Sequence, residues 1–154
     1  MLHKLTELQV LIKDLPIQRL VVAMANDDHV IEAVELARKK QAIKPILIGP
    51  SDAIKHLLQV HQYPLDEYIL IDAMSAEEAA MKAVEMIKNK KADLLMKGLL
   101  DTKVLLKMVV NKETGIRDEG LLSHVAVFSF PKLNRLLFAT DCAMVINPSV
   151  DEKE

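Results

Sequence analysis

Short runs of apolar residues alternate along the chain with segments whose apolar residues recur every three or four positions. Four of the runs have the length of a strand and lack the apolar–polar alternation of a strand with one face in water. They cover residues 19–25, 45–49, 68–72 and 92–97. A segment with helical spacing follows each run, so the pattern predicts βαβ units and a mainly parallel sheet with helices on both faces.

The predicted helices carry start and stop signals. A first helix is expected within residues 2–15, where a proline follows. Asn26 and Asp27 supply cap chemistry for the next helix, which ends in three basic residues that suit the helix dipole. Ser51 is expected to cap the third helix. Ser75 and Glu78 have the spacing of a capping box at the start of the fourth.

The alternation of strands and helices stops near the end of a fifth helix, which is expected over residues 102–110. The next ten residues are polar, contain two glycines and indicate a loop. Residues 123–130 and 135–139 resemble strands and flank a short turn, which predicts a β-hairpin. Residues 144–146 could form one more short strand.

Length and composition fit one compact domain. The 154 residues are 51% hydrophobic and 27% charged. With the order of elements, this predicts a single α/β domain over residues 1–154, a three-layer αβα fold with a mainly parallel sheet and a carboxyl-terminal β-hairpin. Cys142 is the single cysteine, which indicates a reducing, cytoplasmic location. We find no secretory signal and no membrane-spanning apolar run, so no membrane partner is expected.

Several function classes are disfavoured by the same sequence. A net charge of −2 and an aromatic content of 3% argue against a nucleic-acid partner. The five histidines lack metal-ligand spacing, so no metal site is expected. Neither a G-x-G-x-x-G nor a P-loop motif is present, which argues against a dinucleotide or P-loop phosphate site at the first βα turn.

Open α/β sheets bind ligands at the carboxyl ends of their parallel strands. Among the four predicted strand ends, only that of residues 92–97 carries a cation, Lys97, which precedes Gly98. A helix begins close to Asp101 and Thr102, so its backbone N–H groups and the ammonium could bind one anion. The same residues also allow a plainer interpretation, with Lys97 a solvated loop residue and Asp101 a simple N-cap.

Four short motifs, MKG at 96–98, GIR at 115–117, LSHV at 122–125 and TD at 140–141, stand within longer segments that resemble the phosphate acetyl/butyryltransferase family. The resemblance extends from about residue 19 to residue 148 and is closest to the phosphate butyryltransferase branch. It implies reversible transfer of a butyryl or branched short-chain acyl group between coenzyme A and phosphate, on an isocitrate/isopropylmalate-dehydrogenase-like architecture. It implies acyl-CoA and inorganic phosphate as partners, coenzyme A as a substrate, and no covalently bound cofactor.

The resemblance also suggests residues that bind substrate. Lys97 and Gly98 match a strand-end motif that lines the family's cleft. Asp101 and Thr102 fall where the start of a helix faces the phosphate. Arg117 matches an arginine near the cleft and is the best phosphate candidate, because the guanidinium fork suits phosphate oxygens. A solvated loop position is the alternative for Arg117.

Three weaker catalytic candidates lie around the predicted hairpin. The resemblance places Ser123 and His124 at its start and Asp141 after its second strand. The reaction needs a base, because a free thiol has a pKa of ~8.5 and is mostly protonated at neutral pH. It also needs donors for a tetrahedral oxyanion. The alternatives are a strand-end cap for Ser123, a packed strand histidine for His124 and a turn former for Asp141.

Members of the family are considerably longer than this chain. The resemblance therefore implies an amino-terminal portion that is inactive or nearly inactive alone, and that associates as a homodimer or with a second half. The competing hypothesis is a non-catalytic phosphate- or CoA-binding or regulatory module that retained the fold. A decarboxylating dehydrogenase on the same fold is disfavoured, because no matching aspartate cluster for a divalent metal is visible.

Overall fold

The computed structural model describes residues 3–12, 15–116 and 122–141. Their contacts group into two compact units, which we describe separately. The larger unit is Pro16–Ile116, and the smaller unit contains the other described residues, including a first helix and a β-hairpin. The single domain expected over residues 1–154 stays a prediction.

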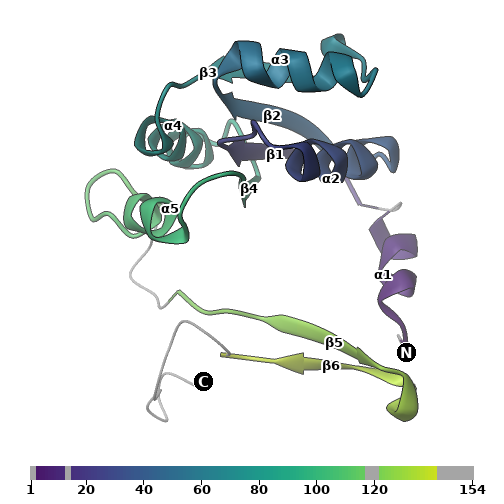
Figure 1. The fold of residues 1–154 in the computed structure, drawn as a ribbon. Helices are drawn as coiled ribbons and strands as arrows, with labels where there is room; N and C mark the ends of the chain where they lie inside the picture. Colours follow the sequence, from purple (N-terminus) through teal and green to yellow (C-terminus); the bar gives the residue numbers. More distant parts are fainter. Residues whose placement is uncertain (1–2, 13–14, 117–121, 142–154) are drawn as a thin grey trace. The chain divides into compact units, whose positions relative to one another are not determined.

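The larger unit has the predicted alternation of strands and helices (Figure 1). Its elements are β1 (Gln18–Ala23), α2 (Asp28–Lys39), β2 (Ile43–Gly49), α3 (Ser51–Val60), a 3-10 turn (Leu65–Glu67), β3 (Ile69–Asp72), α4 (Ala76–Lys88), β4 (Leu94–Lys97) and α5 (Thr102–Val109). Within the described residues, the strands form a parallel sheet in the order β3-β2-β1-β4. The α/β class and the parallel sheet are confirmed.

The three-layer arrangement follows from the alternation of side chains along β1. Val21 and Ala23 belong to one buried cluster, which also contains the inward faces of α4 and α5. Leu20 and Val22 belong to a second cluster with the inward faces of α2 and α3. Because successive strand side chains point to opposite faces, an entirely apolar strand such as β1 needs helices on both sides.

An ion pair fixes β4 beside β1 at the amino ends of these strands. The Asp93 carboxylate accepts hydrogen bonds from Arg19 Nη2 at 2.7 Å and from Arg19 Nε at 2.9 Å. It also accepts one from the Arg19 backbone N–H. These bonds hold the pKa of Asp93 at about 2. Bidentate geometry makes this pair more specific than an ordinary surface ion pair.

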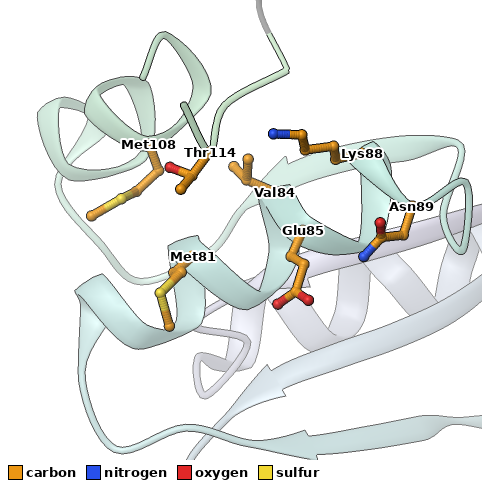
Figure 2. A pocket seen from close by; sticks show the side chains of 7 residues that line it. All are labelled: Met81, Val84, Glu85, Lys88, Asn89, Met108 and Thr114. Carbon is orange, nitrogen blue, oxygen red and sulfur yellow. The ribbon is translucent and has the colours of Figure 1, made fainter. Parts of the chain in front are cut away.

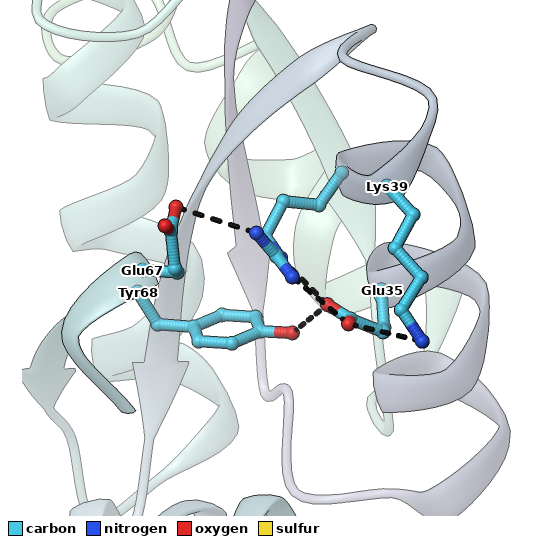
Figure 3. Close-up of polar contacts among 5 residues, drawn as sticks. Glu35, Lys39, Glu67 and Tyr68 are labelled. Carbon is cyan, nitrogen blue, oxygen red and sulfur yellow. Dashed lines mark hydrogen bonds and ion pairs between the residues drawn. The ribbon is translucent and has the colours of Figure 1, made fainter. Parts of the chain in front are cut away.

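A second polar cluster joins α2 to the start of β3 (Figure 3). The Glu35 carboxylate, which is only 2% exposed, accepts hydrogen bonds from Arg38 at 2.6 and 3.0 Å and from the Tyr68 hydroxyl at 2.5 Å. Arg38 also pairs with Glu67, and Lys39 pairs with Glu35. The hydrogen bonds from Arg38, more than any other contact, lower the pKa of Glu35 to about 2. Burial is tolerated because the charge is paired and hydrogen-bonded.

The helix starts confirm two predicted caps and correct a third. Asp27 accepts a hydrogen bond from a backbone N–H of α2, and Ser75 accepts one from Glu78 N at the start of α4. The expectation that Ser51 caps α3 is wrong, because Pro50 is the N-cap residue and Ser51 is the first helical residue. The Asp72 carboxylate, from the end of β3, accepts the Ser51 N–H at 2.9 Å instead.

The smaller unit confirms the predicted hairpin. Strands β5 (Ala126–Phe130) and β6 (Arg135–Ala139) pair antiparallel and are joined by a 3-10 turn (Pro131–Leu133). Helix α1 (Leu5–Ile12) lies within the predicted segment, and His3 Nδ1, just before it, contacts the carbonyl oxygen of Asn134 at 2.6 Å. Residues 144–146, the further predicted strand, lie outside the described residues.

The low pKa of Glu35 predicts acid-sensitive stability. Folding lowers the pKa of Glu35 from its usual 4.5 to about 2. The stabilisation is therefore complete above pH 4.5 and is lost as the pH falls toward 2. We expect Glu35→Gln to lower the free energy of unfolding near neutral pH by about 2 kcal/mol. Denaturant unfolding at several pH values should also show that, in the acid range, the free energy of unfolding of this variant falls less steeply with decreasing pH than that of wild type. Glu32→Gln, at an exposed position of α2, is the control. If the free energy of unfolding of Glu35→Gln fell with decreasing pH as steeply as that of wild type, the prediction would be contradicted.

Candidate functional site

The strand order identifies one place where the chain changes the side on which it adds strands to the sheet. The chain runs from β1 to β2 and β3 on one side and then crosses back to place β4 on the other side of β1. The carboxyl ends of β1 and β4 therefore flank a topological switch point, the usual ligand position in open α/β sheets. We call the two loops that leave these strands, residues 24–27 and 98–101, the switch-point loops.

The switch-point loops touch through their backbones. Gly98 N donates to Ala23 O at 2.8 Å, and Leu99 N donates to Met24 O at 2.7 Å. A Cβ on Gly98 would lie 2.1 Å from Met24 O, so only glycine allows this approach. Met24 itself adopts a φ of 54°, a conformation uncommon outside glycine.

Three residues predicted from the sequence lie in the second switch-point loop or directly beside it. The ammonium of Lys97 donates to Leu100 O at 2.8 Å and to Gly98 O at 3.3 Å, so it holds its own loop. Asp101 is the N-cap of α5, and its carboxylate accepts a hydrogen bond at 2.8 Å from the backbone N–H two residues further on. Thr102 is the exposed first residue of that helix. The plainer interpretation therefore holds for Asp101, which is an N-cap, whereas Lys97 is the last residue of β4 and its ammonium contacts two carbonyl oxygens. An anion-binding role stays a prediction.

Asn26, in the first switch-point loop, was expected from the sequence only to help cap α2, whose N-cap is Asp27, and not to belong to a ligand site. Its Oδ1 is buried and has no hydrogen-bond partner among the described residues. Buried polar atoms are normally paired, so an orphaned one needs a reason. The residue follows a strand without a glycine motif, and only the strand order shows that it lies at the switch point.

The hairpin candidates belong to the smaller unit. His124 precedes β5, and Asp141 follows β6. Ala126 pairs with Ala139, so the antiparallel register brings the approach to β5 and the exit from β6 to the same end of the hairpin. Ser123 is exposed, whereas Nδ1 of His124 is buried and makes no hydrogen bond with the part of the chain that the structure describes. Arg117, the predicted phosphate ligand, lies outside the described residues.

No group of three or more His, Cys, Asp or Glu side chains among the described residues is arranged to hold a metal ion. No described helix combines the length and apolar character needed to cross a membrane.

Comparison with known proteins identifies relatives over most of the chain. A family model described as "Phosphate acetyl/butaryl transferase" matches residues 70–154. A phosphate butyryltransferase of Clostridium acetobutylicum is 37% identical over 153 residues, which cover 99% of this chain and 51% of that protein. A probable phosphate butyryltransferase of Bacillus subtilis is 43% identical over 136 residues, covering 86% of this chain and 44% of that protein. The chain thus spans about half the length of the curated relatives it matches.

Solved structures show the same fold. A branched-chain phosphotransacylase from Enterococcus faecalis superposes with a TM-score of 0.72 at 23% identity, covering 86% of this chain and 46% of that one. A phosphotransacetylase from Streptococcus pyogenes gives a TM-score of 0.79 at 15% identity, covering 97% of this chain and 55% of that one. At these identities the likeness establishes the fold alone.

The close approach at Gly98 predicts a large effect of a small substitution. The added methyl group of Gly98→Ala would meet backbone atoms of β1 that cannot move aside. We expect a loss of about 3 kcal/mol in the free energy of unfolding, measured by denaturant titration. Leu99→Ala, at the exposed neighbouring position, should cost less than about 1 kcal/mol. Equal effects of the two substitutions would show that the approach is not restrictive.

Proposed function

This chain belongs to the phosphate acetyl/butyryltransferase family, and from this premise we propose that it takes part in reversible acyl transfer between coenzyme A and phosphate. The acyl group we propose is butyryl or a branched short chain, since the relatives include phosphate butyryltransferases. Acyl-CoA and inorganic phosphate are the proposed small-molecule partners. The observation that carries the proposal is the family match, together with a switch point whose loops present a cation and a helix start.

We place the phosphate at the second switch-point loop. Two carbonyl oxygens already accept from the Lys97 ammonium, which has three N–H donors, so one donor is left for a ligand. Among the first backbone N–H groups of α5, those of Lys103 and Val104 already donate to Asp101, so the Thr102 N–H is the one we propose for the phosphate, together with the partial positive charge of the helix start. Arg117 is also proposed as a phosphate ligand, as the family resemblance implies, because its guanidinium can make a bidentate contact.

His124 is our candidate for the base that helps to form the CoA thiolate. Its unpaired Nδ1 and its place at the same hairpin end as Asp141 support a histidine–carboxylate arrangement. An aspartate in such a pair orients the imidazole and stabilises its protonated form. Ser123, exposed beside it, is a candidate donor to the oxyanion.

The chain spans about half the length of its relatives, which bears on how much of the cleft it supplies. Because the relatives are about twice as long, we propose that this chain supplies one wall of the cleft and works with a second half or as a homodimer. A cytoplasmic location is proposed from the substrates, since acyl-CoA is made and used inside the cell. The competing hypothesis, a binding module without turnover, uses the same site.

Phosphate binding tests the proposed site. We expect calorimetry to show saturable binding of phosphate, with an affinity about tenfold weaker in Lys97→Met and in Arg117→Ala, because each removes a charged hydrogen bond. Lys107→Met, at an exposed position in the last turn of α5, should bind as wild type does. Binding that is unchanged in both test variants would refute the assignment. An assay of CoA release from butyryl-CoA then separates the enzyme from the binding module.

The role of His124 predicts a thiol-dependent contact. We expect CoA to shift the imidazole proton resonances of His124 in NMR spectra, and desulfo-CoA to shift them much less. Asp141→Asn should weaken the response, because the imidazole loses its orienting carboxylate. His56, on α3, serves as the internal reference. Equal shifts with both ligands would exclude contact between the thiol and His124.

A further inference from the structure

A groove in the larger unit is lined by none of the candidate site residues named above (Figure 2). It is formed by α4, by α5 and by the turn that follows α5, and has a volume of about 340 Å³. Its lining comes from the carboxyl-terminal parts of both helices, whereas the switch-point loops lead into the amino-terminal end of α5. The groove therefore needs an explanation of its own.

The floor and one end of the groove are apolar and adaptable. Val84, which is buried, lines the groove together with Met81 of α4 and Met108 of α5 (Figure 2). Met81 is half exposed, although a large apolar side chain gains free energy by being covered. Unbranched methionine side chains can close around ligands of different shapes. This end of the groove is suited to a small aliphatic group.

Two opposite charges border the same groove and do not pair with each other. Glu85 and Lys88 lie one turn apart on α4, at a spacing where opposite charges often meet. The Glu85 carboxylate makes no hydrogen bond or ion pair with any described residue. Lys88 Nζ donates to Glu113 O at 2.7 Å, which leaves two of its three N–H donors free.

We propose that this groove binds a free aliphatic α-amino acid. The ligand's ammonium would lie on Glu85, its carboxylate on Lys88 and its side chain on the methionine-lined floor. A simple carboxylic acid would leave Glu85 unpaired and nearby, and an amine would do the same to Lys88. A cavity of roughly 150 Å³ already holds a benzene-sized molecule, so the groove has room for an amino acid and bridging water.

Binding would also add to the contacts between α4 and the turn that follows α5. The Lys88–Glu113 bond connects α4 to the turn after α5, and Thr114 of that turn lines the groove. A bound carboxylate would add a second connection at Lys88.

The test is a titration of the whole chain with leucine, followed by the amide resonances of isotope-labelled protein. We expect saturable shifts in α4, α5 and the following turn, with a dissociation constant in the millimolar range, as suits so small a ligand. Glycine, isocaproate and isoamylamine each lack one of the three recognised groups. Each should bind at least about tenfold more weakly than leucine.

Matched variants assign the charges. Glu85→Gln should weaken leucine binding about tenfold but leave isocaproate binding unchanged or improved, because the exposed carboxylate matters only for the ammonium. Glu77→Gln, an exposed position of the same helix outside the groove, should have no effect. The proposal is overturned if leucine causes no saturable shift up to about 50 mM, if isocaproate binds as tightly as leucine, or if Glu85→Gln binds leucine normally.

Discussion

The position of β4 against β1 is the constraint on which the candidate site depends. At the amino ends of these strands, the bidentate ion pair of Arg19 with Asp93 holds them together. At the carboxyl ends, Gly98 lies directly on the backbone of β1 because it has no side chain. These two contacts place the Lys97 loop and the start of α5 beside the exit of β1, which creates the switch point.

The two ends of the sheet serve different purposes. Buried and paired charges gather at the amino ends, where Glu35 and Tyr68 join α2 to β3. The carboxyl ends instead carry an orphaned amide oxygen on Asn26, an unusual backbone conformation at Met24 and a lysine that holds carbonyl groups. Stabilising contacts at one edge allow strain and unpaired groups to persist at the other, as is typical of functional sites.

Local signals in the sequence predicted most of the fold. Apolar runs of strand length identified all four parallel strands, and the spacing of Ser75 and Glu78 identified a cap within one turn of helix. What the sequence could not show depends on distant residues. The cap of α3 comes from Asp72 rather than from the adjacent Ser51, and Asn26 becomes notable only when strand order is known. The relation between the switch-point loops and the hairpin candidates likewise stays a prediction.

The central claim is that the switch-point loops form the phosphate side of an acyl-transfer site. The most direct measurement is a map of amide chemical shifts as phosphate, and then coenzyme A, is added to isotope-labelled chain. The account predicts that the largest phosphate-dependent shifts fall on residues 98–102, with smaller ones on residues 24–27. Saturable phosphate binding with its shifts centred elsewhere, for example along the outer faces of α2 and α3, would contradict it.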